Sequence, residues 1–320
     1  MFALSYKSKK YLLVALKVFI LAITFGYIYV KITQNETIDF SVYLKNAFKE
    51  NTLFSILIFC LLAATNWFFE IVKWKKMISE TQEISFSTSL KQSLTSLTIS
   101  LTTPNRIGEY GAKSLFFEKG KRKQILLLNF FHNSFQMLVT IVFGIIGLGI
   151  VFENYNLNKL NTISENQLLI GLLLLILLIG IGFYFRKKQL LFKGLSLSNV
   201  YLKLNQVSFQ TKFKVLLFSI IRYFIFSFLF FKLLQFFGVE ISINQALPLV
   251  FSMYLLSSIV PTIFIFDVVV KGGVAVWLFS MVGVSDVAVL SAVFSMWLLN
   301  FVIPSVFGAY FLMAYKPSYL

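Results

Sequence analysis

The chain has 320 residues, of which 58% are hydrophobic and only 13% are charged, and 38 of them are phenylalanines. Its mean hydropathy of +0.81 excludes a water-soluble domain of this size. Apolar runs of about 20 residues recur, which is the length that a helix needs to cross a bilayer. The composition therefore predicts an all-α, polytopic integral membrane protein rather than a barrel of short alternating strands.

A net charge of +16 first suggests nucleic acid as a partner, but the positions of the charges favour another explanation. Lys and Arg cluster in short segments at the ends of the apolar runs, as they do in cytoplasmic loops. Such loops also attract anionic lipid headgroups. We therefore expect membrane lipids as partners, and no nucleic acid. Cys60 is the single cysteine, so the chain offers neither an internal disulfide nor a cysteine-based metal site.

Taken in order, the chain predicts long apolar helices separated by short polar loops. The first apolar stretch is too long for a signal peptide and lacks a small-residue cleavage site, so it is predicted to be an uncleaved helix. We expect one transmembrane domain over 1–320, with about six to eight spanning helices and with halves at 1–152 and 167–316. The expected apolar segments are 11–31, 52–72, 125–152, 167–185, 215–238, 246–266, 273–284 and 287–315.

The loop charges predict the topology. The N-terminus, the loops 73–85, 104–124 and 186–214, and the end at Lys316 are rich in Lys and Arg, so they and both termini are expected in the cytoplasm. The loops 153–166 and 239–245 are poor in these residues and are expected outside.

This topology makes two segments unusual. The Ser/Thr-rich segment 86–103 has cytoplasmic loops on both sides, so it must enter and leave from one face or lie in the interface. In the other half, 246–284 begins and ends outside and is expected to be broken in the middle by Asp267, Lys271, Gly272 and Gly273. Broken elements of opposite orientation suggest the inverted repeat of many transporters. The alternative is an ordinary bundle of eight or nine spans with one kinked segment.

The stretch that follows the Ser/Thr-rich segment gathers residues that could bind an anion. Pro104 can begin a helix without losing a hydrogen bond, and the free N–H groups of that helix would lie beside Arg106. Gly108 and Gly111 would let another backbone or a lipid headgroup come close.

Two ion pairs at helical spacing mark this stretch and a later one. Glu109 and Lys113 are four residues apart, and Asp267 and Lys271 repeat the spacing after Pro261. Placing a charged side chain within the hydrocarbon layer costs free energy, so each such residue is expected to have a functional or structural role. We expect Arg106, Lys113 and Lys271 to hold a phosphate, while Glu109 and Asp267 neutralise them in its absence. The alternative is that these pairs only hold two broken elements in place.

Other polar residues in apolar segments have less specific readings. Arg222 is too deep in its helix to reach the cytoplasmic face easily, so it could line the same cavity or pair with Glu70. Glu70 and Lys73 could form only an interfacial pair. His132 is interpreted as a polar residue near a helix start, and Asn300 is expected to bond to a broken element. The sequence has no catalytic triad, phosphate-binding loop, dinucleotide motif or metal-ligand cluster, so we expect no cofactor.

The motif Thr-Pro-Asn-Arg-Ile-Gly-Glu-Tyr at 103–110 resembles the signature of the lysylphosphatidylglycerol synthase transmembrane family, the flippase-like domain. Three further blocks resemble others of this family: Asn66-Trp67 with Glu70 and Lys73-Trp74, Pro261 with Asp267 and Lys271-Gly272, and Trp297 with Asn300, Pro304 and Gly308. This family usually has Arg at the position of Lys113. It often has Arg at the position of Lys271 and Glu at the position of Asp267. The resemblance implies a stand-alone membrane domain without the aminoacyl-transferase domain.

These observations favour a lipid transporter of the bacterial inner membrane. It would move an anionic phospholipid or a polyprenyl-phosphate-type lipid between leaflets, with the headgroup passing Arg106, Lys113, Lys271 and Arg222. The alternative is a membrane-embedded enzyme, or the membrane subunit of one, that acts on a lipid-linked substrate with an envelope-synthesis enzyme as partner. Of the two, the sequence favours a protein that is not itself an enzyme.

Overall fold

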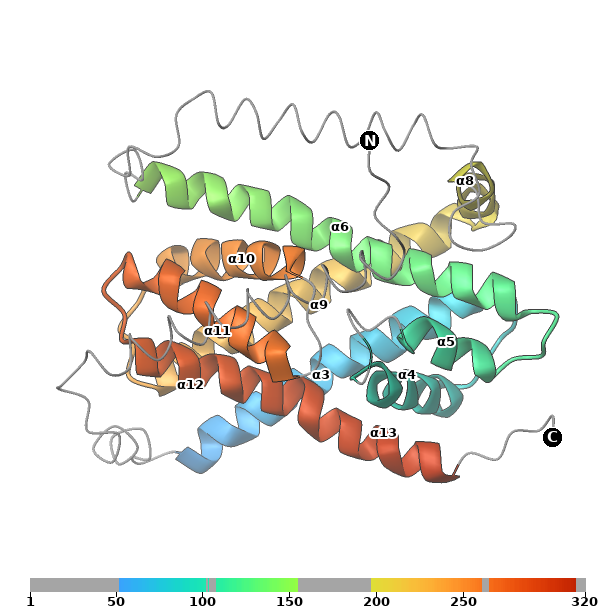
Figure 1. Cartoon of the computed structure of the whole chain (residues 1–320), viewed down its shortest axis with the longest axis horizontal. Helices are drawn as coiled ribbons and strands as arrows, with labels where there is room; N and C mark the ends of the chain where they lie inside the picture. Colours follow the sequence, from blue (N-terminus) through green and yellow to red (C-terminus); the bar gives the residue numbers. More distant parts are fainter. Residues whose placement is uncertain (1–51, 102, 104–107, 155–196, 261–264, 315–320) are drawn as a thin grey trace, which may run out of the picture.

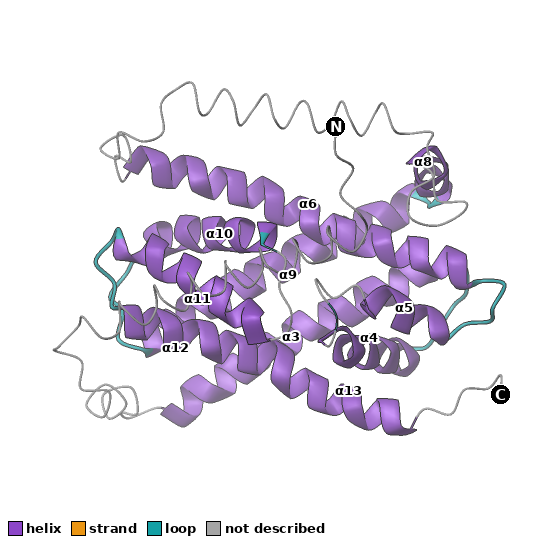
Figure 2. Cartoon of the chain, in the orientation of Figure 1, coloured by secondary structure: helices purple, strands orange, loops and turns teal. Residues whose placement is uncertain are grey.

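The computed structural model of the protein describes residues 52–101, 103, 108–154, 197–260 and 265–314. All regular structure in these ranges is helical, as the composition predicts (Figure 2). Within these ranges, four helices are long and apolar enough to cross a membrane. They are α3 (Thr52–Ile78), α6 (Arg122–Asn154), α9 (Phe209–Phe236) and a continuous helix over Asp286–Ala314. The protein is thus a membrane protein built as a helical bundle. The segments expected at 11–31 and 167–185 lie outside the described residues.

Shorter helices lie beside these four. The segments α4 and α5 lie toward one end of the view in Figure 1, and α10 and α11 toward the other, with α3, α6 and α9 running across both. α4 packs against α3, α5 and α13, while α10 packs most extensively against α6. Their bounds are α4 (Phe86–Leu101), α5 (Gly108–Leu115), α8 (Leu197–Gln206), α10 (Ile243–Ile259) and α11 (Ile265–Ser280).

The expected break at Asp267–Gly273 is wrong in its position. α11 runs unbroken from Ile265 to Ser280, so the ion pair and both glycines lie inside a helix. The interruption comes earlier, after Val260, whose φ of −86° and ψ of 117° are extended. The residue before a proline is driven out of the helical region by the proline ring, and Pro261 follows. The proline therefore ends α10, while the Asp267–Lys271 pair supports the helix that follows.

The glycines of α6 allow α10 to approach closely. A Cβ at Gly147 would lie 2.7 Å from the carbonyl oxygen of Pro248, and one at Gly144 would overlap the side chain of Leu255. Gly149, on the same helix, would meet nothing. Small residues at such positions let membrane helices pack by close backbone contact, so Gly144 and Gly147 fix the α6–α10 contact.

The last helix changes its winding where it passes the middle of the bundle. It consists of α12 (Asp286–Trp297), a π-helical segment η3 (Leu298–Val302) and α13 (Ile303–Ala314). Pro304 has no N–H to donate to the carbonyl of Asn300 and would clash with it in a regular helix. A π-turn, which is often found at functional sites, accommodates such a residue. Beyond it, Gly308 lies against the backbone of Leu94, so α13 contacts α4 closely.

Candidate functional site

One carboxylate gathers basic side chains from four helices. Glu70 of α3 accepts from Arg222 of α9 and lies 3.2 Å from the Nζ of Lys73 on its own helix. The Nζ of Lys113, on α5, lies 4.0 Å from it, and the Nε2 of His132, on α6, lies 3.4 Å away. Glu70 is 8% exposed and Lys73 and Lys113 are fully buried. The sequence left two roles open for Arg222, and the structure gives it both, because it pairs with Glu70 and lines a cavity.

Arg222 is held by a second set of bonds. Its Nε lies 3.2 Å from the carbonyl oxygen of Asn66 and 3.3 Å from the Oδ1 of the same residue. Its Nη1 also donates to the Oε1 of Gln136 at 3.1 Å, and Lys73 donates to that oxygen at 3.3 Å. The guanidinium is therefore fixed by α3 and α6 before any ligand arrives, which favours binding because little side-chain freedom remains to be lost.

Lys113 turns away from the cavity. Its Nζ donates to Glu109 at 2.7 Å and to the Oδ1 of Asn129 at 3.1 Å, and lies 4.4 Å from the centre of the Trp74 ring. The side chain is fully buried, whereas that of Glu109 is 16% exposed. Lys113 thus orients Glu109 toward the cavity and does not itself line it.

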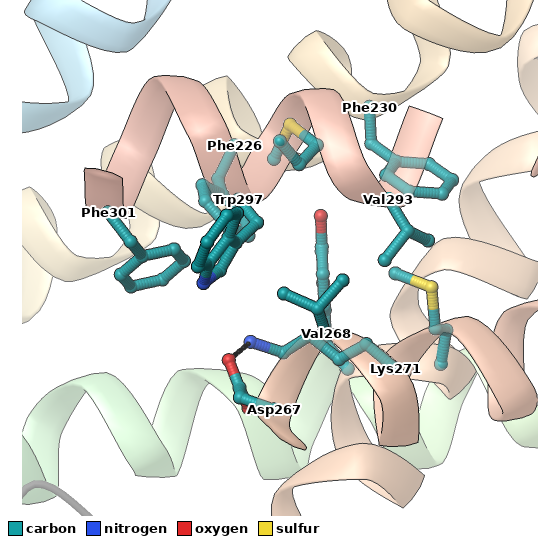
Figure 3. Close-up of a pocket in the computed structure, with 11 residues that line it drawn as sticks. Phe226, Phe230, Asp267, Val268, Lys271, Val293, Trp297 and Phe301 are labelled. Carbon is teal, nitrogen blue, oxygen red and sulfur yellow. Dashed lines mark hydrogen bonds and ion pairs between the residues drawn. The ribbon is translucent and has the colours of Figure 1, made fainter. Parts of the chain in front are cut away.

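The second pair lies on α11. The Nζ of Lys271 donates to Asp267 at 2.6 Å, and each side chain is about a quarter exposed, at 23% and 24%. Figure 3 shows the pair facing the aromatic side chains of Phe226, Trp297 and Phe301. The ring centre of Phe301 lies 5.2 Å from the Lys271 Nζ. A side pocket of about 20 Å³ adjoins the pair, enough for little more than one water molecule.

Asn300 connects the π-helical segment to α3. Its Oδ1 accepts from the Nδ2 of Asn66 at 3.0 Å, and its Nδ2 donates to the carbonyl of Met296 at 3.1 Å. Its own carbonyl, which Pro304 cannot serve, accepts from the Nε1 of Trp67 at 3.1 Å. An unpaired carbonyl within the membrane would be costly, so Trp67 replaces the missing backbone donor.

A single cavity of about 470 Å³ joins these groups. Side chains from α3, α4, α5, α6, α9, α10, α11 and the last helix line it. Its charged members are Glu70, Glu109, Arg222, Asp267 and Lys271, and Asn300 is also in its wall. Glu109 and the Asp267–Lys271 pair therefore border one space, although 158 positions separate Glu109 from Asp267 in the chain.

Several expected residues take other positions. Arg106, Pro104 and Pro261 lie outside the described residues. Gly108 packs tightly, since a Cβ there would lie 2.8 Å from the Oγ1 of Thr103, and its N–H donates to that oxygen. Gly111 has open space around it. Gly272 is buried within α11.

The sequence reading missed the neutral polar wall. Gln136, Tyr223, Tyr254 and Ser93 all line the cavity, and none was singled out. One signal was present: on α6, the polar residues Asn129, His132, Asn133, Gln136 and Thr140 recur at helical spacing in an apolar run.

One group of side chains has the composition of a metal site. Glu70, Glu109 and His132 bring potential ligand atoms within 4.8 Å of one another. Lys73, Lys113 and Arg222, however, already pair with these carboxylates, so a divalent cation would meet three positive charges at close range. The lysine and arginine side chains occupy the place that a cation would take.

In comparisons with known proteins, no family model, curated protein or solved structure matches the chain.

Proposed function

We propose that the protein moves an anionic lipid between membrane leaflets, with the lipid headgroup passing through the cavity. The observation that carries the proposal is the cavity itself: about 470 Å³ inside an apolar bundle, lined by Arg222, Lys271 and three carboxylates. Ionisable groups within a membrane are costly, and they mark substrate or ion pathways by default. The resemblance of 103–110 to a flippase-like domain family supports the same function.

Arg222 and Lys271 are the groups that would bind the phosphate. Both line the cavity with part of their side chains exposed, at 17% and 23%. Arg222 offers a planar set of donors that suits a phosphate. Arg106, which precedes α5 in the sequence, would add a third base. Lys73 and Lys113, behind the wall, raise the positive potential without touching the headgroup.

The carboxylates would pair with the basic side chains when no lipid is bound. Glu70 and Asp267 would hold Arg222 and Lys271 when no lipid is bound and release them to its phosphate. Movement would be passive or driven by an ion gradient, with Glu109 or Asp267 as the proton carrier. We further propose six to eight spans in an inverted repeat, both termini in the cytoplasm, and a place in the bacterial inner membrane.

The test is leaflet exchange of fluorescent phosphatidylglycerol in liposomes that hold the purified protein. We expect Arg222→Gln and Lys271→Gln to slow exchange at least about tenfold, because each removes a charged contact to the phosphate. Lys232→Gln is the matched control, since Lys232 lies on α9 but outside the cavity lining and bonds to Gln235. Exchange that is absent in the wild type under any ion gradient would overturn the proposal.

A further inference from the structure

We infer that Lys73 is a proton-binding site, and that it takes up a proton together with each anionic headgroup that Arg222 binds. The inference rests on the proposed function and deepens it, because it names the coupling ion and the residue that carries it. It is carried by two oxygen atoms that Lys73 and Arg222 share, and by the balance of buried charges around them.

Lys73 and Arg222 bond to the same two oxygen atoms. The Nζ of Lys73 lies 3.2 Å from the Oε2 of Glu70 and 3.3 Å from the Oε1 of Gln136. The Nη1 of Arg222 donates to both of these oxygens as well. Two positive charges at one pair of oxygens repel each other, and Lys73 is fully buried, where solvent screens this repulsion least. The shared contact therefore favours one charged base rather than two.

Among the described residues, the cluster around Glu70 has more bases than acids. Its bases are Lys73, Lys113 and Arg222, and its acids are Glu70 and Glu109. A buried base without a counter-charge loses its proton rather than remain ionised in an apolar medium. Before a lipid binds, the surplus base is therefore expected in its neutral form.

Lys73 is the base that can lose its proton. Arginine remains ionised in proteins, and Lys113 has a carboxylate of its own, since it donates to Glu109 at 2.7 Å. Lys113 also donates to Asn129 and lies over the Trp74 ring. A charged lysine has three N–H donors, and the neutral amine has two. Lys73 has two acceptors among the described residues, so its neutral form leaves no donor unpaired.

An anion at Arg222 changes this balance. When Arg222 turns from Glu70 to a phosphate, the shared oxygens become free for Lys73, and the phosphate adds the missing negative charge. A proton from the cavity then bonds to the nitrogen lone pair of Lys73. It arrives through Glu70, which contacts Lys73 and also lines the cavity. A monoanionic headgroup and a proton therefore enter together, and the two carry no net charge.

The neighbouring charged groups fit this role less well. His132 of α6 faces the Oε1 of Glu70 at 3.4 Å, which is not the oxygen that Arg222 releases. Lys113 of α5 lies 4.0 Å from that Oε1, so a proton on His132 would add a positive charge beside another. On α4, which packs against α3, the single charged residue is Lys91, and its side chain is exposed.

Glu109 and Asp267, the carboxylates named above as proton carriers, also fit less well than Lys73. Glu109 keeps the buried Lys113, which does not line the cavity and so does not leave it for a phosphate. Asp267 loses its partner if Lys271 turns to the headgroup, but 24% of its side chain is exposed. Water in the cavity can solvate this ionised carboxylate, whereas Lys73 is fully buried.

The experiment measures proton uptake when short-chain phosphatidylglycerol binds to the full chain in detergent. A pH-indicator dye in weakly buffered solution reports the protons, and the shift in thermal unfolding with lipid concentration reports the affinity. We expect uptake that approaches about one proton per bound lipid, and an affinity that falls by up to about tenfold per unit as the pH rises from about 6 to about 9. Dimethyl phosphate, the same anion without the lipid, separates a lipid headgroup from a free phosphate ester as the ligand.

Two variants at one position test the assignment. Lys73→Gln removes the proton acceptor, and Lys73→Arg keeps a charge at every pH. Neither should take up a proton with the lipid, and the affinity of each should be independent of pH. It should equal that of the wild type at high pH in Lys73→Gln and at low pH in Lys73→Arg. Thermal unfolding without lipid checks that both fold. Lys232→Gln, outside the cavity lining, is the control and should keep the uptake.

Binding to the wild type without proton uptake would overturn the inference, and so would the absence of binding. Uptake that survives in Lys73→Gln, or that disappears instead in His132→Gln or Asp267→Asn, would also overturn it. Uptake with dimethyl phosphate and none with the lipid would do the same.

The proposed function fails separately. Leaflet exchange in liposomes that a pH gradient does not drive would overturn the proton coupling and keep lipid transport. Proton uptake that depends on Lys73, without any leaflet exchange, would overturn lipid transport and keep the proton site.

Discussion

Glu70 and Arg222 lie 152 positions apart in the chain, yet the guanidinium of Arg222 donates directly to the Glu70 carboxylate. The contact joins α3 to α9 beside the cavity. Lys73 and Lys113 lie behind the same carboxylate. Glu70 is thus the acid shared by several buried bases, and its loss should be felt more than the loss of any one of them.

Glu70→Gln should lower the free energy of unfolding by about 3–5 kcal/mol, because it leaves buried positive charges without their shared partner. Arg222→Gln should cost less, about 1–3 kcal/mol, since Glu70 keeps Lys73. Thermal and denaturant unfolding in micelles would measure both. Glu153→Gln, at an exposed position on α6, should stay within about 0.5 kcal/mol of the wild type. Equal costs for the first two variants would contradict the shared-acid arrangement.

Trp67→Phe should lower the free energy of unfolding by about 1–3 kcal/mol, because the Asn300 carbonyl then loses its donor. Pro304→Ala returns a backbone N–H to that carbonyl. Added to Trp67→Phe, it should recover most of the loss, and a double-mutant cycle would measure the coupling. Trp277→Phe, at an exposed position on α11, is the control. Additive effects at 67 and 304 would show that the two residues do not serve one carbonyl.

Gly147→Ala should destabilise the protein by about 1–3 kcal/mol, because the added methyl group meets Pro248 and Phe251 of α10 and forces the helices apart. Gly149→Ala is a matched control on the same helix, with open space around the added carbon. It should be neutral or stabilising by up to about 1 kcal/mol, because alanine favours the helix. Thermal unfolding of both variants would decide, and equal melting temperatures would refute the contact.

Glu80 should make stability depend on acid pH. Partial burial acts to raise the pKa of Glu80, but hydrogen bonds from Thr211 and Ser208 hold it below its ordinary value. The backbone N–H and Oγ of Ser208, at the start of α9, lie 3.1 and 2.7 Å from the carboxylate. Because the pKa of Glu80 is lower in the folded protein than in the unfolded chain, its ionised carboxylate stabilises the fold at pH values above the unfolded-state pKa. This stabilisation is lost as the pH falls through the folded-state pKa.

Wild type and Glu80→Gln should therefore differ in melting temperature at pH 7 and converge as the pH falls below about 4. The difference should be small, since Glu80 remains accessible to solvent, and salt should reduce it further. Glu83→Gln, nearby in the same loop, tests for a general charge effect. The prediction would be contradicted if the difference in melting temperature between wild type and Glu80→Gln grew as the pH was lowered.

The sequence predicts the helical class and several of the long apolar helices, because hydropathy and length alone decide what can cross a membrane. The expected helix at 125–152 agrees closely with α6, Arg122–Asn154. The break near Asp267 was misplaced because charged residues and glycines were read as helix breakers. The residue that ends the helix is Val260, because Pro261 follows it. The Asp267–Lys271 ion pair, with its i,i+4 spacing, favours a helix instead of breaking it.

The candidate site was harder to predict, since it depends on which helices meet. Spacing along the chain pairs Glu109 with Lys113 and Asp267 with Lys271, and the structure has both bonds. Spacing cannot show that Lys113 points toward Asn129 and Trp74 or that Tyr223 and Tyr254 border the same space. Those contacts follow from the packing of α3, α5, α6, α9 and α10 around one another.

The bond between Trp67 and the Asn300 carbonyl limits how the bundle can change shape. If α3 slid along the last helix by even part of a turn, that carbonyl would be left without a donor inside the membrane, and the amide pair of Asn66 and Asn300 would separate as well. These bonds therefore favour an arrangement in which the two helices keep their register. If the protein transports lipid as proposed, opening toward either leaflet would then come from the elements that face these two helices across the cavity.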